Sequence, residues 1–394
     1  MNRTASATIG AKPTIVLAAN SAWNIVNFRG GLVRALKEAG YEPLVVAPAD
    51  PACEERMGRL GVEQVPLELD RSGMSPVADA RLFFAYRRLL LKFRPLAFLG
   101  FTSKPNIYGS LAARTVGVPA IANISGLGTA FLGRGGLMKF VTSLYRLALR
   151  RTDVVFFHNR DDLELFLELK LVSADQAGLL PGSGIDLQQF ESQPLPRGGP
   201  IFLLVARLLG DKGVREFAAA ARIVRQEHRN ARFQLLGPID DGNRTAITWA
   251  ELDGWVASGA VEYLGVADDV RPFIGKATAI VLPSYREGLP RSLLEGAAMA
   301  RPLVTTDVPG CREVVEDGVN GYLCAVRSAT ALAEAMDKLC RLTVAERRSM
   351  GLAGRAMVAR RFDEKLVVGA YLERLRQLEP SARPPALQAN AFSG

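Results

Sequence analysis

Histidine and cysteine are scarce in this chain, which has two histidines and four cysteines among its 394 residues. Two histidines cannot supply a histidine-rich metal centre, so that kind of site is excluded. The cysteines show no paired C-x-x-C spacing, which favours reduced thiols in the cytosol. Long apolar runs are also missing, since none approaches 18 residues, and the first twelve residues lack the apolar core of a signal peptide. The sequence therefore predicts no membrane-spanning helix.

Acidic residues are nearly absent from one part of the N-terminal half. Residues 71–151 contain thirteen Lys or Arg and a single acid, Asp79, whereas the rest of the chain has 36 basic and 39 acidic residues. The formal net charge of +9 at pH 7 therefore originates in this window. Such an asymmetry predicts a polyanionic partner, which is a nucleic acid, an anionic membrane or a phosphorylated substrate. The window contains no nucleic-acid-binding motif, so we expect no nucleic-acid partner.

Strand-like and helix-like segments alternate along both halves of the chain. The composition is ordinary for a globular protein, with 48% hydrophobic and 23% charged residues, and the length indicates two or three domains. The predicted strands are residues 13–18, 41–47, 65–69, 96–101, 120–124 and 154–157, then 201–205, 233–236, 261–264, 279–282 and 302–306. This alternation predicts the α/β class, with parallel, doubly wound sheets.

A segment rich in proline and glycine separates the two halves. Residues 187–200 have three prolines, two glycines and little periodicity, which is typical of a linker between domains. We therefore predict an N-terminal domain at 12–186 and a C-terminal domain at 201–362. A last helix at 363–378 follows, and residues 379–394 are predicted to form a loose tail.

Two carboxylates mark the stretch from residue 279 to residue 321. Glu287 lies in the loop after the strand 279–282, and Glu295 lies on the helix that follows, with seven residues between them. Both are near the C-terminal end of a parallel strand, where doubly wound sheets bind their ligands. The spacing therefore predicts a ligand site at this strand end.

Two cations follow the first strand of the second half. Arg207 and Lys212 lie beside Gly213 and a predicted helix N-terminus, an arrangement that suits a diphosphate. The alternative is a solvated loop with a surface salt bridge to Asp211. In the first half, Gly30 and Gly31 lie in a predicted loop, residues 19–31, and either let the backbone approach a phosphate or merely open the next helix.

Taken together and in order, these motifs resemble those of the retaining GT-B glycosyltransferases of family 4, over about residues 12–378. The motifs of the second half are Arg207 with Lys212-Gly213, the run EGLPRSLLE from Glu287 to Glu295, Arg301-Pro302, Asp307-Val308-Pro309-Gly310 and Asn320-Gly321-Tyr322. In the first half, TSKPNIYG at 102–109, GLG at 126–128 and GID at 184–186 resemble a narrower branch. That branch extends undecaprenyl-diphosphate-linked sugars, as the N-acetylgalactosaminyltransferase of bacterial N-glycosylation does.

The resemblance implies a GT-B fold, two doubly wound Rossmann-like domains facing across a cleft, and a UDP-sugar as donor. It implies that Glu295 binds the ribose hydroxyls and that Glu287, with a catalytic role, holds hydroxyls of the donor sugar. Arg207 and Lys212 would stabilise the departing diphosphate. The backbone of Gly288, Leu289 and Pro290 would face the donor. The sequence contains no Asp-x-Asp motif, so we expect neither a metal nor another cofactor.

The same resemblance assigns the acceptor to the first domain, and the last helix is expected to cross back to that domain. The implied acceptor residues are Lys104, Asn106, Asn123 and Ser125. Lys104 either binds an acceptor diphosphate or is a surface lysine that opens a helix. Many relatives have a histidine where this chain has residues 122–126; here Asn123 or Ser125 is left to fill its place by hydrogen bonding. His158 is interpreted as structural.

Apolar residues recur at helical spacing in residues 137–151, among four Lys or Arg side chains. Such a helix either lies in a membrane interface or packs on its own sheet with the basic side in solvent. The charge asymmetry favours membrane contact. We therefore expect a peripheral enzyme on the cytoplasmic face of the inner membrane that acts on a polyprenyl-diphosphate-linked acceptor. The alternatives are a UDP-sugar 2-epimerase of the same fold and a non-enzymatic, membrane-docked sugar-nucleotide binder.

Overall fold

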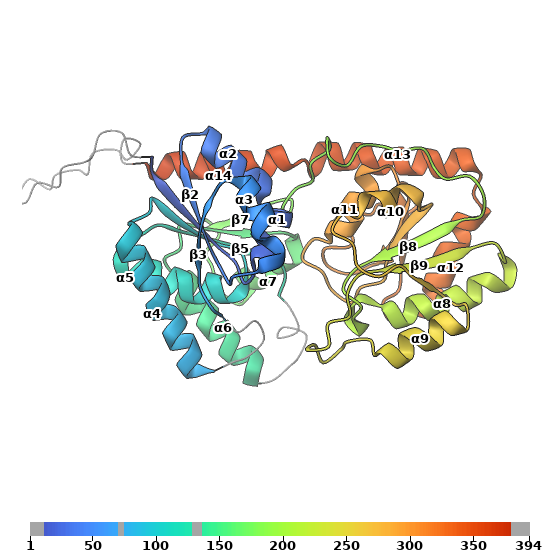
Figure 1. The fold of residues 1–394 in the computed structure, drawn as a ribbon, viewed down its shortest axis with the longest axis horizontal. Helices are drawn as coiled ribbons and strands as arrows, with labels where there is room; N and C mark the ends of the chain where they lie inside the picture. The colour runs from blue at the N-terminus through green and yellow to red at the C-terminus, as the bar shows by residue number, and fades with distance from the viewer. Residues whose placement is uncertain (1–11, 70–74, 128–135, 380–394) are drawn as a thin grey trace, which may run out of the picture.

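The chain folds into two α/β domains in a computed structural model that describes residues 12–69, 75–127 and 136–379 (Figure 1). The described strands of the first domain form a seven-stranded sheet in the order β3-β2-β1-β4-β5-β6-β7. Their bounds are Thr14–Ala18 (β1), Glu42–Ala47 (β2), Glu63–Pro66 (β3), Ala97–Gly100 (β4), Ala120–Ile124 (β5), Val154–Phe157 (β6) and Ala177–Leu179 (β7). All of these strands run parallel.

The second domain repeats this plan with a six-stranded parallel sheet in the order β10-β9-β8-β11-β12-β13. The bounds are Ile201–Val205 (β8), Arg232–Leu236 (β9), Glu262–Tyr263 (β10), Ala279–Leu282 (β11), Leu303–Thr306 (β12) and Gly321–Cys324 (β13). Strands such as β11, with the sequence AIVL, are buried on both faces because helices cover both sides of the sheet. The fold class predicted from the sequence is confirmed.

In each sheet the order in which the chain adds strands reverses at the centre. In the first domain the chain builds outward from β1 through β2 to β3, then returns to place β4 on the other side of β1. In the second domain the chain builds outward from β8 through β9 to β10, then returns to place β11 on the other side of β8. Ligands of doubly wound sheets bind at such switch points, outside the carboxyl ends of the strands. The loops after β1, β4, β8 and β11 are therefore where a site is expected.

The helices of the first domain are α1 (Ala22–Phe28), α2 (Gly30–Glu38), α3 (Glu54–Leu60), α4 (Pro76–Phe93), α5 (Ser110–Val116), α6 (Gly136–Leu149) and α7 (Arg160–Glu168), with a π-helical turn, η2, at Pro105–Gly109. A short 3₁₀ turn, η1 (Pro51–Cys53), precedes α3. The helices of the second domain are α8 (Val214–Glu227), α9 (Trp249–Ala257), α10 (Arg271–Lys276), α11 (Arg291–Ala298), α12 (Ala329–Arg341) and α13 (Val344–Arg361), with a 3₁₀ turn, η4, at Gly210–Lys212.

The final helix, α14 (Glu364–Leu378), leaves the second domain and packs on the first. Its residues Val367, Tyr371 and Leu375 join the apolar core that lies beside β1 and β4. Figure 1 shows α13 and α14 end to end along one side of both domains. The two crossings of the chain are bonded to each other, because Ile185 N donates to Phe362 O at 2.9 Å and Glu364 N donates to Ile185 O at 3.1 Å.

Several elements differ from the sequence prediction. The segment predicted as a loop between residues 19 and 31 contains α1, whose first turn is capped by Ser21 accepting a hydrogen bond from Asn24 N at 3.2 Å. The sequence prediction also missed α3, α10, β7 and β13, which are short elements of three to seven residues. The predicted helix at 137–151 is α6, and its first residues adjoin a segment outside the described residues. No helix in the described ranges is long and apolar enough to cross a membrane.

Candidate active site at the domain boundary

The loop after β11 is held at the switch point of the second sheet by two glycines. Gly213 has a φ of +72°, and a Cβ on it would lie 2.1 Å from the carbonyl oxygen of Pro283, where no side chain fits. Gly310 has a φ of +78°, and a Cβ on it would likewise lie too close to the carbonyl oxygens of Glu287 and Gly288. Because both neighbours approach backbone to backbone, the loop that carries Glu287 has little freedom to move within its own domain.

Lys212 and Glu287 meet at this switch point. Lys212 Nζ lies 2.5 Å from Glu287 Oε1, and the two side chains are 23% and 13% exposed. From the sequence, Lys212 is expected to bind the diphosphate and Glu287 the donor sugar. The fold brings these two side chains together although they lie 75 positions apart in the chain. The arrangement offers a cation for a phosphate and a carboxylate for hydroxyls within one small space.

Arg207 lies after β8, beside this pair in the chain but with a partner of its own. Its guanidinium contacts Asp240 at 2.7 Å, and its side chain is 55% exposed. The sequence left open a surface salt bridge between these cations and Asp211. Among the described residues, neither Arg207 nor Lys212 forms that salt bridge. Arg207 is therefore the more accessible of the two predicted phosphate ligands.

Glu295 projects from the first turns of α11 and is bound by Arg291, which donates to its carboxylate at 3.0 Å. Burial raises the pKa of Glu295, and the positive charge of Arg291 opposes that rise. Arg291 also donates to Ser183 Oγ at 3.0 Å and lies over the ring of Phe28 at 5.3 Å. Glu295, the residue predicted to bind the ribose, is thus oriented by an arginine that also contacts the first domain.

The predicted donor backbone at Gly288, Leu289 and Pro290 lies against the first domain. A Cβ on Gly288 would lie 1.7 Å from Ser125 O, so only glycine permits this approach. Leu289 packs against Gly182, and Pro290 is the residue before α11. Ser125, predicted to contact the acceptor, is exposed at this boundary. It lies next to Gly288 in residues 283–290, the loop between β11 and α11 that we call the donor loop because it is predicted to face the donor.

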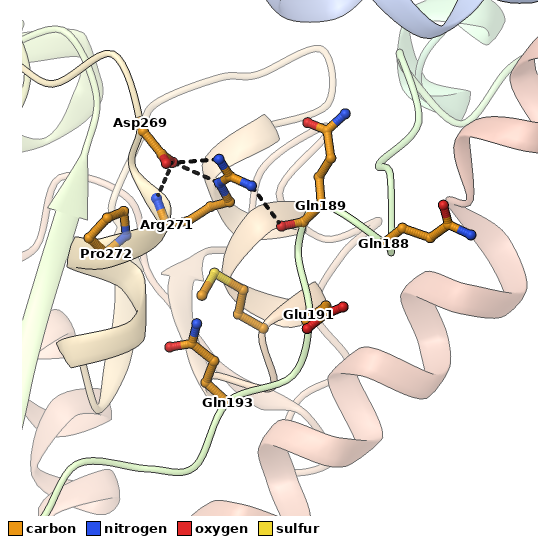
Figure 2. Close-up of a pocket in the computed structure, with 8 residues that line it drawn as sticks. Gln188, Gln189, Glu191, Gln193, Asp269, Arg271 and Pro272 are labelled. Carbon is orange, nitrogen blue, oxygen red and sulfur yellow. Dashed lines mark hydrogen bonds and ion pairs between the residues drawn. The ribbon is translucent and has the colours of Figure 1, made fainter.

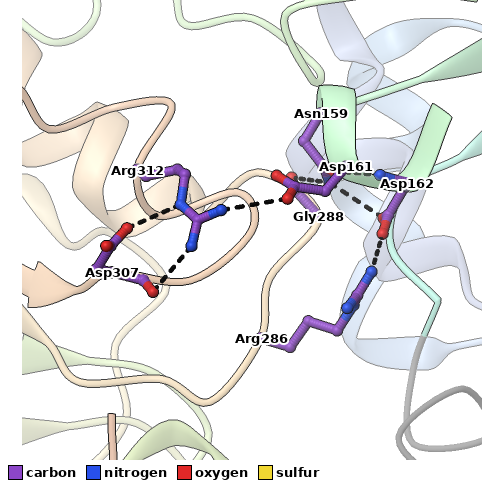
Figure 3. A network of polar contacts seen from close by, with 7 residues as sticks. All are labelled: Asn159, Asp161, Asp162, Arg286, Gly288, Asp307 and Arg312. Atoms are coloured by element: carbon purple, nitrogen blue, oxygen red, sulfur yellow. Dashed lines mark hydrogen bonds and ion pairs between the residues drawn. The ribbon is translucent and has the colours of Figure 1, made fainter. Parts of the chain in front are cut away.

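A polar network that the sequence did not reveal joins the same loop to α7 (Figure 3). Asn159 Nδ2 donates to Gly288 O at 2.8 Å, and Arg286 is paired with Asp162, whose side chain is fully buried. Nearby, Arg312 lies between Asp161 at 3.2 Å and Asp307 at 2.8 Å. Only the N-cap pattern of Asn159 was visible in the sequence, because the partners lie more than 120 positions apart.

Two of the predicted acceptor residues bond to the protein itself. Asn106 Nδ2 donates to Asn123 O at 2.7 Å, and Asn123 Nδ2 donates to Gly100 O at 2.8 Å. Asn123 Oδ1 accepts from Tyr371 of α14, and neither asparagine is more than 1% exposed. Binding of an acceptor by these two residues stays a prediction, and it would require buried side chains to give up their hydrogen bonds to the protein.

Lys104 is paired with Asp79, the one acidic residue of the basic window, at 2.8 Å. Burial and a hydrogen bond to the same carboxylate raise the pKa of Tyr108. Lys104 would therefore have to leave a carboxylate in order to bind an acceptor diphosphate.

Gly30 and Gly31 begin α2 and do not form an open loop. A Cβ on Gly31 would lie 2.2 Å from the carboxylate of Glu364, which covers that side of the helix end. A phosphate could reach Gly31 from that side only if Glu364 moved away. The residue immediately before them, Arg29, was not among the predicted site residues, although it lies at the switch point of the first sheet.

A pocket of about 340 Å³ opens between the linker and α10 (Figure 2). Its lining includes Gln188, Gln189, Gln193 and Met299, and its one arginine, Arg271, is held by Asp269 at 2.8 Å. None of the predicted site residues lines it. The pocket therefore lies apart from the carboxylates and cations of the switch point.

One group of described residues has the composition of a cation site, namely Glu227, His228 and Asp337 between α8 and α12. The guanidinium of Arg341 pairs with Glu227 at 2.6 Å and with Asp337 at 2.7 Å. A cation would have to displace that arginine, and the group contains none of the predicted site residues. Metal independence stays a prediction.

The chain matches one family model in each domain. Residues 26–182 match the model described as glycosyl transferase 4-like domain, and residues 199–341 match glycosyl transferases group 1. The matched segments include Asn159 and Asp162 of the first domain and Gly288 and Arg286 of the second, which meet at the domain boundary.

Two curated relatives extend this similarity. The chain is 30% identical over 370 residues to the N,N'-diacetylbacillosaminyl-diphospho-undecaprenol alpha-1,3-N-acetylgalactosaminyltransferase of Campylobacter jejuni, covering 89% of this chain and 95% of that protein. It is 22% identical over 281 residues to the UDP-Gal:alpha-D-GlcNAc-diphosphoundecaprenol alpha-1,3-galactosyltransferase of Escherichia coli, covering 67% and 71%.

Solved structures share the two-domain architecture. Anabaena HepE in complex with UDP and glucose aligns with a TM-score of 0.77 at 17% identity, over 93% of this chain and 100% of that chain. Sucrose-phosphate synthase of Thermosynechococcus elongatus aligns with a TM-score of 0.75 at 19% identity, over 93% and 99%. At these identities the structures establish the fold alone.

Proposed function

Because this chain belongs to the group 1 glycosyltransferases and has their GT-B fold, we propose that it transfers a hexose or an N-acetylhexosamine from a UDP-sugar to a polyprenyl-diphosphate-linked sugar. The observation that carries the proposal is the match along nearly the whole length of the C. jejuni transferase, whose name specifies such an acceptor. The name of the E. coli relative adds a UDP-sugar donor. The reaction would serve assembly of a bacterial glycan such as an O-antigen, capsule, exopolysaccharide or N-glycan.

The proposed donor site is the switch point of the second sheet. Lys212, with the more exposed Arg207, would stabilise the diphosphate as the bond between sugar and phosphate breaks. Glu287 would accept hydrogen bonds from the sugar hydroxyls, and Glu295 would accept those of the ribose. The proximity of Lys212 to Glu287 supports this division, because the diphosphate and the sugar are adjacent groups of one donor.

We propose that transfer retains the anomeric configuration. The acceptor hydroxyl would attack the anomeric carbon on the face from which the diphosphate departs. A new carbon–oxygen bond forms as the old one breaks, and the hydroxyl proton passes to the departing phosphate oxygen. The protein would supply positive charge and orientation for this step, without a metal ion.

The first domain is proposed to meet an anionic membrane through α4 and α6. Both helices border a pocket of about 540 Å³ lined by Phe83, Tyr108, Leu111 and Phe140, among others. The exposed residues of the two helices combine large apolar side chains with cations, and they include Arg81, Phe84, Arg87, Arg88, Leu91, Lys139, Phe140, Arg146 and Leu147. Apolar and basic side chains together suit a surface that lies in the headgroup region.

Membrane contact is testable by changing charge alone. Replacing Arg146, Arg150 and Arg151 by Gln should weaken binding to phosphatidylglycerol vesicles about a hundredfold, since each cation contributes about 1 kcal/mol near an anionic surface. A matched control replaces three exposed arginines of the second domain, Arg229, Arg348 and Arg360. Equal sedimentation of both variants would show that α6 does not touch the membrane.

The transfer itself is tested with a panel of UDP-sugars and synthetic polyprenyl-diphosphate acceptors, with and without a chelator. Products are read by mass and by the anomeric configuration of the new linkage. Absence of transfer from every common UDP-sugar would refute the proposal, and inversion would refute the retaining mechanism.

The comparisons support transfer over the two alternatives. The relatives that cover most of the chain are named as transferases, whereas neither a 2-epimerase nor a non-enzymatic binder is among them. Incubation with the donor alone separates the possibilities, because an epimerase converts a UDP-sugar without an acceptor. We expect no such conversion.

A further inference from the structure

Arg29 is a buried cation without a partner. The residue is 3% exposed, and its guanidinium makes no hydrogen bond or ion pair with any residue in the described ranges. Buried charges in proteins are normally paired, and an unsatisfied one calls for a ligand, an ion or a function. Arg301, another buried arginine, also has nitrogens without a partner among the described residues, but its Nη2 donates to the carbonyl oxygens of Gln193 and Pro194 at 2.9 Å, whereas Arg29 makes no such bond.

The position of Arg29 is that of a ligand-binding residue. It follows α1, the element that leads away from β1, and its guanidinium lies 4.4 Å from the ring centre of Phe101, directly after β4. Strands β1 and β4 are the neighbours at which the first sheet reverses direction. Arg29 therefore lies at the switch point of the first sheet, as Lys212 does in the second.

A second unsatisfied group lies close by. His158 follows β6, and its Nε2 is buried without a hydrogen-bond partner among the described residues. Burial lowers the pKa of this imidazole, and the positive charge of Arg29 lowers it further. Nε of Arg29 and Nε2 of His158 are thus two buried nitrogens without a hydrogen-bond partner among the described residues.

Groups on two other elements, Arg291 on α11 and both Glu364 and Tyr371 on α14, influence the charge of Arg29. Arg291 of the second domain opposes its charge, and Glu364 of α14 favours it, while Tyr371 also interacts with it. Arg29 and Arg291 carry the same charge on the two domains, but Arg291 is balanced by Glu295 at 3.0 Å, whereas Arg29 forms no ion pair with a described residue. An anion at Arg29 would thus supply the ion pair that the described residues do not.

We propose that Arg29 binds the diphosphate group of a substrate at the switch point of the first sheet, with His158 beside it. This inference rests on the proposed function, which supplies two diphosphates, that of the UDP-sugar and that of the lipid-linked acceptor. Arginine suits this ligand because its planar fork can donate two hydrogen bonds to one phosphate. Phe101 holds the guanidinium plane in place before the ligand arrives.

The test compares Arg29→Met and Arg29→Lys with the wild-type enzyme, using calorimetry with UDP and with farnesyl diphosphate. We expect the methionine variant to lose about tenfold or more in affinity for one probe, the loss typical of a charged hydrogen bond, and lysine to restore part of it. A loss for UDP identifies the donor diphosphate, and a loss for farnesyl diphosphate alone identifies the acceptor. Arg59→Met, on the exposed surface of α3, is the control.

Thermal unfolding without ligand separates binding from packing. Removing an unpaired buried charge should leave Tm unchanged or raise it, so a stable variant with weakened binding supports the proposal. Unchanged affinity for both probes would overturn it, and a lower Tm in that case would give Arg29 a packing role instead.

A measurement on the wild-type protein covers the case in which both variants fail to fold. Titration with inorganic diphosphate should shift the NMR signals of the His158 ring, which are assigned with a His158→Gln variant. No shift would overturn the proposal. If diphosphate binds through Arg29 but no sugar is transferred, the proposed function fails while this inference stands.

Discussion

The cations at the switch points of the two sheets differ in one respect. In the second domain each of them lies against a carboxylate, with Lys212 at Glu287, Arg207 at Asp240 and Arg291 at Glu295. In the first domain Lys104 is paired in the same way, with Asp79, but Arg29 has no carboxylate partner within the described ranges, and Nε2 of the nearby His158 has no hydrogen-bond partner there either. The two domains share one plan of sheet and helix but hold their positive charge in different ways.

The difference suggests two ways of preparing for an anion. A paired cation is already oriented, and a substrate exchanges with, or adds to, the carboxylate that holds it. An unpaired buried cation destabilises the free protein by an amount that a bound anion can recover. The first arrangement favours release of a charged product, and the second ties binding to the stability of the protein. The following substitutions test this contrast, beginning with the largest expected effect.

Replacing Glu287 by Gln should abolish most of the transfer while leaving UDP binding intact. The substitution removes the proposed sugar ligand and frees Lys212, so kcat should fall about a hundredfold or more, and UDP affinity should stay the same or rise. Kinetics and calorimetry measure the two effects. Glu262→Gln, at the paired edge strand β10, is the matched control. Unchanged turnover would remove Glu287 from the mechanism.

The link between the domains should be the next most sensitive. Asp162→Asn leaves Arg286 without its buried partner, and such a loss destabilises proteins by about 3 kcal/mol or more. We expect a lower Tm and a lower kcat, since Arg286 precedes Glu287 in the donor loop. Adding Arg286→Met should recover part of the stability, and strict additivity of the two changes would show that the pair is not coupled.

His158 predicts an effect of acid on stability. Its folded pKa is lowered from 6.5 to about 3, so between these values the unfolded chain binds a proton that the folded chain does not. The contribution of this group to stability is therefore present above pH 6.5 and is lost as pH falls, by about 1.4 kcal/mol per pH unit. His158→Gln should flatten the acid limb of unfolding curves.

The smallest effect is expected at Arg207. Its pair with Asp240 is exposed, and such pairs contribute about 1 kcal/mol or less. Arg207→Met should leave Tm nearly unchanged and raise the donor KM a few-fold, because Lys212 remains. A loss as large as that of Lys212→Met would show that exposure is a poor guide to the importance of these cations.

Much of the fold was predictable because buried strands are short apolar runs that end at proline or glycine. The motif that we propose for donor binding was also visible in the sequence. Its carboxylates, Glu287 and Glu295, lie close together in the chain after one strand. Pairings such as Arg286 with Asp162 were not visible, because they join segments 124 positions apart. The bonds of Asn123 to β4 and α14 were not visible either, because Tyr371 lies 248 positions away in the chain. Arg29 was overlooked because arginine is normally exposed.

The paired crossings at Ile185 and Phe362 have a mechanical consequence. The two covalent connections between the domains are hydrogen-bonded to each other at one point, so we expect any relative motion of the domains to turn about that point. The donor loop and α7 lie elsewhere on the boundary, where rotation about that point translates into opening and closing. A disulfide engineered across the crossings would leave that swing largely intact, whereas one between α7 and the donor loop would stop it.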